Sequence, residues 1–285
     1  MTIKELRALT LAMKIYIDES HGWARYGKHR AVTSSALLER TGQHYAEKSA
    51  DATPLWIFDI DSTLMCLSAR FQYIFFDYLR FHHPGPVSPA IWAAAHRLSP
   101  EEHRYGIFES LYPAFLQCGI EDAEALARQF EERMLPFWLD AFFSDRYLDK
   151  DFAYPGAAAF VSAVQAMGVH VCYLTGRPAK NMTQGTRQSL RQLGFPLDDQ
   201  SSFLVLKSNH DESDVEYKHR YLQQLNRRYR VLGFVDNEPE NVRAQIQINR
   251  DAASVWFHSI SSNRIPELTP YESEHLCVLR SFNNQ

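Results

Sequence analysis

The sequence predicts an α/β protein with three layers, in which helices cover both faces of a parallel sheet. From residue 55 onward, short apolar runs of the kind found in buried parallel strands alternate with helical patterns. Acidic or hydroxyl residues directly follow several of these runs, as they do at the carboxyl ends of strands in open sheets. A long helix-rich stretch interrupts the alternation once, after the first strand, and predicts an inserted helical cap.

The expected strands and helices follow one another in regular order. The apolar runs predict strands at about 55–58, 169–174, 203–206, 231–235 and 254–257. Helical patterns between them cover about 157–167, 179–193, 215–229 and 238–249. Since parallel strands need long crossovers, these helices are expected to connect the strands in right-handed units on both faces of the sheet.

The interruption covers residues 67–151 and is rich in aromatic residues and helix formers. Six prolines punctuate it, and no run within it has the character of a parallel strand. Its position directly after the first strand predicts that it lies over the ends of the strands. We expect most of its aromatic side chains to form the core of the cap rather than to bind a substrate.

The two ends of the chain are less regular. Imperfect helical periodicity predicts an amphipathic helix at 3–18, and a second helix is expected from Ser34 or Ser35 to about residue 48. The last 25 residues, from Ser261, lack clear periodicity and are expected to form a tail on the surface. The predicted division is an extension at 1–50, a core at 51–66 and 152–260, a cap at 67–151 and a tail at 261–285.

Composition narrows the location and the partners. The net charge of −4 in 285 residues offers no broad surface for nucleic acid, and no segment reaches the roughly 18 apolar residues of a membrane span. The amino terminus lacks the apolar region of a secretory signal. Four widely spaced cysteines, without CxxC or CxxH spacing, indicate reduced thiols and a cytoplasmic protein. The oligomeric state stays open.

The most informative segment is the first strand and its end, residues 56–64. The apolar run ends in Asp59 and Asp61, followed by Ser62 and Thr63. An ionised carboxylate at the end of a buried strand is costly unless it is paired or bound to metal. Alternation along extended backbone lets both aspartates point into one crevice. An ordinary strand-to-turn transition is the competing interpretation, because Asp and Ser are common turn residues.

Three later sites have similar positions. Thr175, Gly176 and Arg177 follow the second strand and offer a hydroxyl and backbone amides to an anion. The fourth strand ends in an acidic run at 236–240, and Lys218 lies near the start of the helix before that strand. Taken singly, these sites are also compatible with a turn, a helix N-cap and an exposed helix lysine.

Together, the four sites resemble the motifs of haloacid dehalogenase superfamily phosphatases, namely DxDx[TS], a Ser or Thr, a Lys and an acidic strand end. Here they are Asp59–Thr63, Thr175, Lys218 and Asp236–Glu240, in the family's order, and the resemblance covers about 51–66 and 152–257. It implies a Rossmann-like core with a helical cap in the position called C1. Ser62 stands where many relatives carry glycine.

The resemblance also implies a role for each site residue. Asp59 is expected to be the nucleophile and a metal ligand, and Asp61 the general acid and base, with its backbone carbonyl on the metal. Thr175 and Lys218 are expected to hold the phosphoryl oxygens. Lys207 competes with Lys218 for the lysine role. The other expected site residues are Asp236 on the metal, Glu238 or Glu240 in support of it, and Thr63, Gly176 and Arg177 at the phosphate. For Arg177, a structural ion pair is an equally weighted alternative.

The charges of these residues predict a cofactor. Two carboxylates about 4 Å apart repel each other by roughly 4 kcal/mol at an effective dielectric near 20. Lys218 balances only one of the three charges on Asp59, Asp61 and Asp236. A hard divalent cation is therefore expected, and oxygen ligands favour Mg²⁺.

The expected activity is that of a Mg²⁺-dependent phosphomonoesterase that forms an aspartyl-phosphate on Asp59 and acts on a small phosphorylated metabolite. Asp61 argues against a dehalogenase or phosphonatase, since those relatives in general lack an aspartate there. The alternatives are a phosphatase of nucleotides or nucleic-acid ends, a phosphotransferase, and a non-catalytic binding or regulatory protein.

Overall fold

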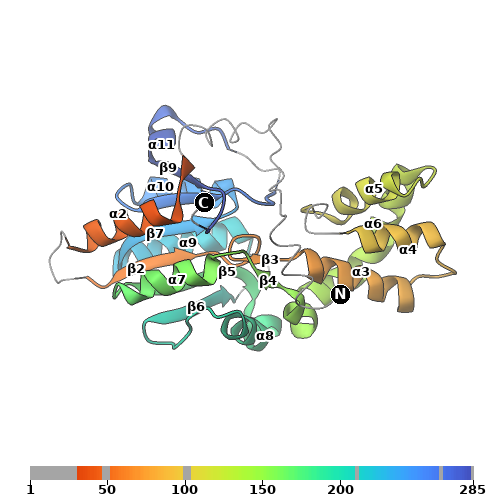
Figure 1. Ribbon diagram of the computed structural model, residues 1–285, viewed down its shortest axis with the longest axis horizontal. Coiled ribbons are helices and arrows are strands. Elements are labelled where there is room, and N and C mark those ends of the chain that lie inside the picture. Colours follow the sequence, from red (N-terminus) through yellow and green to blue (C-terminus); the bar gives the residue numbers. More distant parts are fainter. Residues whose placement is uncertain (1–30, 47–51, 99–103, 209–211, 263–265, 284–285) are drawn as a thin grey trace.

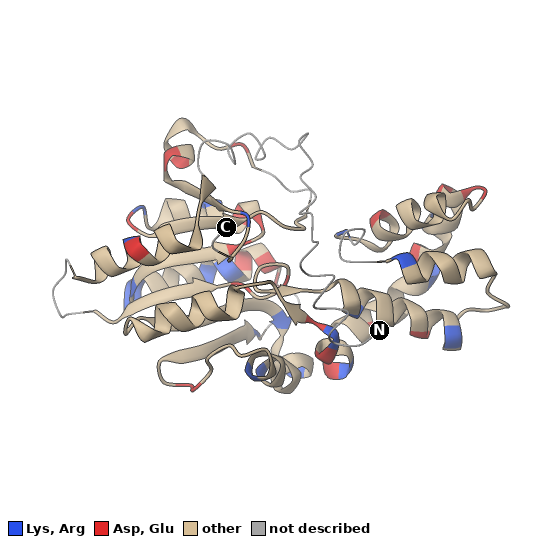
Figure 2. Ribbon diagram, viewed as in Figure 1, with Lys and Arg blue, Asp and Glu red and all other residues tan. Residues whose placement is uncertain are grey.

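The computed structural model describes residues 31–46, 52–98, 104–208, 212–262 and 266–283. These residues form an α/β core and, beside it, a group of helices (Figure 1). The helix expected at 3–18 lies outside the described residues, as does the predicted end of the second helix. In Figure 2, basic and acidic residues are scattered over both parts, and no long basic stretch follows the visible elements.

The core is built on a seven-stranded sheet with the order β1-β9-β8-β7-β2-β5-β6, in which every neighbouring pair of described strands is parallel. The five predicted strands are confirmed. The strands are β1 (Ala31–Val32), β2 (Pro54–Phe58), β5 (His170–Pro178), β6 (Ser202–Lys207), β7 (Arg230–Asp236), β8 (Ala253–Phe257) and β9 (Leu276–Leu279).

Helices cover both faces of this sheet. They are α2 (Ser34–Ala46), α7 (Ala157–Ala166), α8 (Ala179–Gln192), α9 (Asp214–Arg228), α10 (Pro239–Ile248) and α11 (Pro270–His275). Strand β2 is buried on both sides: Trp56 and Phe58 pack with α7, whereas Leu55 and Ile57 pack with α9 and α10. Gly233 of β7 leaves room for this packing, because a Cβ there would come within 2.5 Å of the Trp56 ring. The predicted α/β class with three layers is confirmed.

The inserted segment is helical, as predicted. It contains α3 (Ser68–Phe81), α4 (Pro89–Arg97), α5 (Ile107–Gln117), α6 (Ala123–Phe142) and the 3-10 helix η2 (Asp145–Lys150). These helices share a hydrophobic core of their own, to which Phe71, Phe115 and Phe130 contribute. The chain enters the cap through β3 (Met65–Cys66) and leaves it through β4 (Phe152–Ala153), and these two strands pair antiparallel.

The predicted surface tail from Ser261 is wrong. Residues 276–279 form β9, which pairs with β8 on one side and β1 on the other. Phe282 is also buried, in the core cluster on the α7 face. The apolar run of β9 is only four residues long, too short to show a period. The segment before residue 50 likewise joins the sheet through β1, which the sequence pattern did not indicate.

No helix within the described ranges is long and apolar enough to cross a membrane.

Candidate active site

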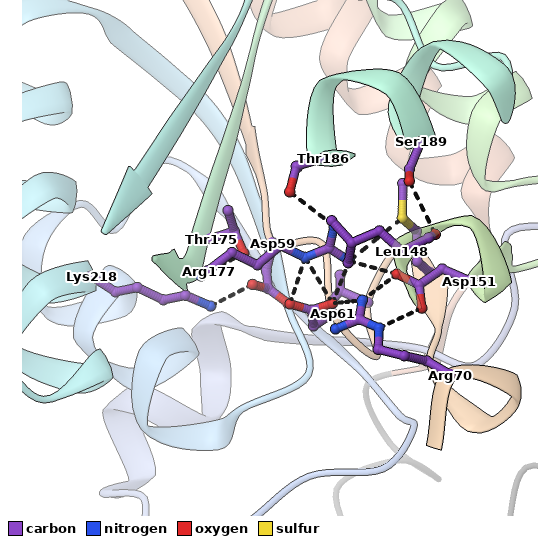
Figure 3. A network of polar contacts seen from close by, with 12 residues as sticks. Asp59, Asp61, Arg70, Leu148, Asp151, Thr175, Arg177, Thr186, Ser189 and Lys218 are labelled. Carbon is purple, nitrogen blue, oxygen red and sulfur yellow. Dashed lines mark hydrogen bonds and ion pairs between the residues drawn. The ribbon is translucent and has the colours of Figure 1, made fainter. Parts of the chain in front are cut away.

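Three neighbouring strands bring the predicted motif residues together at the carboxyl ends of the strands. Strand β2 lies between β7 and β5, and all three run in the same direction. Asp59 directly follows β2, Asp236 ends β7, and Thr175 lies near the end of β5. Lys218 reaches the same place from the first turns of α9, whose start is fixed by a capping box between Ser213 and Glu216. Figure 3 shows how Asp59, Thr175 and Lys218 lie in this place.

Asp59 and Asp236 share the ammonium group of Lys218. Lys218 Nζ donates to Asp59 Oδ1 at 2.6 Å and to Asp236 Oδ2 at 2.8 Å. All three residues are buried. The second oxygen of Asp59 accepts from the Thr63 hydroxyl at 2.7 Å, and Thr63 accepts in turn from the backbone N–H of Asn237 at 3.0 Å. Asp59 is thus held on both oxygens, at the base of the site.

Burial disfavours the charged forms of both Asp59 and Lys218, but only the pKa of Asp59 is shifted toward the neutral form. Burial, against the opposing effect of Lys218 and with the help of the nearby carboxylates of Asp236 and Asp61, raises the pKa of Asp59 to about 7. Burial alone would lower the pKa of Lys218, but Asp236 and Asp59 raise it above its ordinary value. Lys218 is therefore a permanent cation, and Asp59 depends on positive charge nearby to remain ionised at neutral pH.

Asp61 points away from Lys218, toward two arginines. Arg177 donates from Nε to Asp61 Oδ2 at 2.9 Å and from Nη2 to Oδ1 at 2.6 Å. Arg70, on the first cap helix α3, donates from Nη2 to Asp61 Oδ1 at 3.3 Å. Both guanidinium groups also bind Asp151, just after η2, with Arg70 Nε to Oδ1 at 2.8 Å and Arg177 Nη2 to Oδ2 at 2.9 Å.

This cluster keeps Asp61 ionised. Burial by itself would raise the pKa of Asp61, but Arg177 and then Arg70 lower it to about 2. For Asp151, burial prevails over the same two arginines, and its pKa is raised. The side chain of Asp61 is 28% exposed, against 4% for Asp59. Of the two aspartates, Asp61 is therefore the one nearer to solvent.

Of the other residues predicted to bind phosphate, two line the cavity and two do not. Gly176 and Arg177 line the cavity described below. Thr175 is fully buried, and its hydroxyl accepts from the backbone N–H of Arg177 at 3.3 Å. The Thr63 hydroxyl points to Asp59, as described above. Neither threonine is among the residues that line the cavity.

The remaining motif positions also have clear partners. Lys207, the competitor of Lys218, pairs with Asp214 at 2.8 Å instead of with a motif aspartate. Ser62 has a φ of +57°, a left-handed conformation that glycine adopts most easily. Glu238 accepts from Ser262, and burial raises its pKa. Glu238 lines the cavity, whereas Glu240 does not.

The donors at the strand ends fit a hard cation held by few protein ligands. Asp59 and Asp236 already converge on one positive group. Beside them, Asn241 donates to Asp236 at 3.1 Å, while its Oδ1 is buried and has no hydrogen-bond partner in the described structure. No cluster of three or more His, Cys, Asp or Glu side chains in the described ranges is arranged to hold a metal. Mg²⁺ commonly uses one or two carboxylates and completes its octahedron with water and phosphate oxygens.

The site opens into a cavity of about 400 Å³ between the core and the cap. The core side supplies Asp59, Asp61, Arg177 and Lys218. The cap side supplies mainly apolar and aromatic side chains from α6 and from the start of α5. A cavity of this volume suits a small molecule.

Sequence reasoning missed Arg70, Asp151, Asn237 and Asn241. Asn237 and Asn241 lie within or directly after the acidic run at 236–240, so their proximity to the motif was a usable signal. Arg70 and Asp151 are 81 residues apart and lie at opposite ends of the insertion. No local pattern marks such a pair.

Residues 143–250 match the family model of the haloacid dehalogenase superfamily, subfamily IIIB (acid phosphatase). The matched range includes Thr175, Lys218 and Asp236 but begins after Asp59. A comparison with curated protein sequences found no match to the chain.

Solved structures with a similar fold include the class C acid phosphatase of Bacillus anthracis with tungstate bound, at 12% identity over 85% of this chain and 76% of that one, with a TM-score of 0.39. A haloacid dehalogenase-like hydrolase of Streptococcus pneumoniae has 11% identity over 81% and 95%, with a TM-score of 0.42. A predicted phosphoglycolate phosphatase of Haemophilus somnus has 17% identity over 82% and 96%, with a TM-score of 0.45.

The sequence keeps the motif order of the superfamily outside the matched range as well, beginning at Asp59. On that order and on the match over residues 143–250, the chain is similar to the phosphatases of the haloacid dehalogenase superfamily.

Proposed function

We propose that the protein is a Mg²⁺-dependent phosphomonoesterase that passes through an aspartyl-phosphate on Asp59. One observation carries the proposal: the carboxylate of Asp59 lies at the base of a cavity of about 400 Å³ and shares a buried lysine with a second aspartate. A nucleophile, a fixed cation for the phosphoryl oxygens and a second acid for a metal are thereby next to one another.

Asp59 attacks phosphorus in line with the leaving oxygen, and Lys218 balances the charge that spreads over the phosphoryl oxygens. Mg²⁺ held by Asp59, Asp236 and the backbone carbonyl of Asp61 would supply further positive charge at the phosphoryl group. That charge also favours the ionised form of Asp59.

Asp61 acts as the general acid and base. Since Arg177 and Arg70 keep it ionised, it is ready to take a proton from water when the aspartyl-phosphate is hydrolysed. To protonate the leaving oxygen first, it must lose part of this stabilisation. An incoming phosphate competes with Asp61 for Arg177, which lines the same cavity, and this competition makes Asp61 easier to protonate.

The substrate proposed is a small phosphorylated molecule, because the cavity has the size of a small-molecule site. We place the enzyme in the cytoplasm on the basis of its four cysteines, which are all free of disulfide bonds.

Phenyl phosphate is a suitable first substrate for testing the proposal. Release of phosphate is expected in the presence of Mg²⁺, and Asp59→Asn should lower kcat by at least about 10³-fold, as loss of a covalent nucleophile does. Acid quenching during turnover should trap a phosphoryl group on the peptide that contains Asp59. The exposed Asp149→Asn serves as the control and should retain full activity.

Unchanged turnover in Asp59→Asn would rule out the nucleophile. Activity that survives complete chelation of divalent cations would rule out the metal while leaving the nucleophile in place.

A further inference from the structure

The cap wall of the cavity is formed mainly by one face of helix α6. Glu131, Leu135, Trp138, Leu139 and Phe142 all line the cavity, and their spacing places them on one face of α6. This face spans 12 residues, from Glu131 to Phe142, which is about 16 Å along a helix axis. The wall is therefore an elongated strip that extends well beyond the place of a phosphate group.

The strip has a catalytic end and a far end. Phe142 lies at the catalytic end, because its ring is 4.7 Å from the guanidinium carbon of Arg70, which binds Asp61. Trp138 stacks on Phe142 at 4.3 Å between ring centroids. Glu131 is three helical turns away along the same face. A substrate whose phosphate lies at Asp59 thus directs its leaving group along the strip toward Glu131.

The middle of the strip is apolar and open. Leu135 is 42% exposed and Leu139 is 44% exposed, and Tyr105, at the start of the α5 segment, is 58% exposed. Single exposed apolar residues are ordinary, but here three of the large ones gather in one cavity. Covering such a surface with an apolar group lowers the free energy, because apolar area is removed from water.

The charges of the cavity point to the same kind of leaving group. Its described lining contains two cations, Arg177 and Lys218, and both lie at the catalytic end, bound to the motif aspartates. On the cap side the sole carboxylate is Glu131, which makes no hydrogen bond or ion pair with the residues that the structure describes. A second anion on the substrate would lose water there without gaining a partner.

We propose that the leaving group of the substrate is apolar and carries no second anion, and that Glu131 is a specificity-determining residue that favours an amine at its far end. This inference rests on the proposed phosphatase function. Phosphorylated acids and bisphosphates are therefore expected to be poor substrates, because the described cap lining offers no cation to a second anion.

Three biphenyl-4-yl phosphates test the inference, with methyl, carboxylate or aminomethyl at the 4′-position. The expected order of kcat/KM is aminomethyl, then methyl, then carboxylate, with at least about tenfold between the first and the last. In Glu131→Gln this ratio should fall below about threefold, with the methyl ester little changed. In Glu131→Lys the order of the two charged esters should reverse.

Glu132→Gln is the matched control, because it removes the same charge from the next residue of α6, which is exposed and does not line the cavity. It should keep the wild-type order. A second variant, Leu139→Asn, should lower kcat/KM for the methyl ester by about tenfold while leaving inhibition by inorganic phosphate unchanged. The side chains of Glu132 and Leu139 are both exposed, so the melting temperatures of these two variants should differ little from that of the wild type.

Failure of the proposed phosphatase function and failure of the inference on Glu131 give different results. If neither phenyl phosphate nor any of the biphenyl esters is hydrolysed, the proposed phosphatase function falls, and this inference with it. If all are hydrolysed but Glu131→Gln keeps the wild-type ratio, or if the carboxylate ester is the best substrate of the wild type, only the inference on Glu131 is overturned.

Discussion

The two walls of the cavity differ in how their side chains are held. On the core wall, charged groups bind one another: Lys218 lies between two aspartates, and Arg177 is bidentate on Asp61. On the cap wall, large apolar side chains such as Leu135 and Leu139 are exposed to the cavity. A preorganised charged wall suits a fixed reaction, since its groups need not reorganise. An open apolar wall suits the selection of a leaving group.

The walls are nevertheless connected. Arg70 belongs to the first cap helix, yet it donates to Asp61 on the core and to Asp151 at the return from the cap. The position of the cap therefore affects the surroundings of Asp61 directly. Variants of each wall should show which properties belong to the core alone and which depend on this connection.

The largest effect is expected for Lys218→Met on the core wall. Loss of its ammonium leaves Asp59 and Asp236 facing each other and removes a cation from the phosphoryl oxygens, so kcat/KM for phenyl phosphate should fall by about 10³-fold. Lys207→Met removes a lysine that pairs only with Asp214 among the described residues and should change the rate less than threefold. Similar losses in both variants would contradict the placement of the lysine role at Lys218.

The next largest effect is expected at the connection between the walls. Arg70→Met leaves Asp151 buried with one arginine fewer and should destabilise the protein by about 3–5 kcal/mol, measured by urea unfolding. Adding Asp151→Leu removes the uncompensated charge and should restore a large part of that stability. A double variant no more stable than Arg70→Met would show that Arg70 acts through its packing on Phe142 instead.

The smallest effect is expected at Glu272 in α11, which does not line the cavity. Its carboxylate accepts from the backbone N–H of Thr269 at 2.8 Å, from Gln247 at 2.7 Å and from Arg243 at 3.0 Å. Burial opposes these partners, which nevertheless lower its pKa to about 2. Glu272→Gln should cost about 1–2 kcal/mol at pH 7.

Because the folded pKa lies below the ordinary value of 4.5, this contribution is present above pH 4.5 and is lost as the pH falls through about 2. Urea unfolding of both proteins at pH 7 and pH 3 measures the change. A destabilisation that stays constant between the two pH values would show that the effect comes from packing alone, not from charge.

The sequence was sufficient to predict the core wall because its signals are local. Each buried strand is a short apolar run, and the residue that follows it carries the chemistry, so Asp59 and Asp236 were found without any knowledge of contacts. The resemblance then supplied the order. Whether these residues have the predicted roles still depends on the variants above.

What the sequence did not reveal depends on contacts between distant residues. Arg70 and Asp151 form one cluster only because the insertion begins and ends at the same place. Strand β9 is four residues long and becomes recognisable only from its partners β8 and β1. The direction of the Thr175 hydroxyl, toward the backbone of Arg177, also follows from the local backbone of β5 and from no feature of the sequence pattern.

The pairing of β3 with β4 has a consequence for the history of the molecule. Met65 lies opposite Ala153 and Cys66 opposite Phe152, so the chain leaves the core and returns to it on adjacent strands. The cap therefore has the geometry of a tolerated domain insertion, in which a segment with its own hydrophobic core is added without separating the flanking elements. Through such a junction, evolution can exchange one cap for another and keep the reaction centre intact.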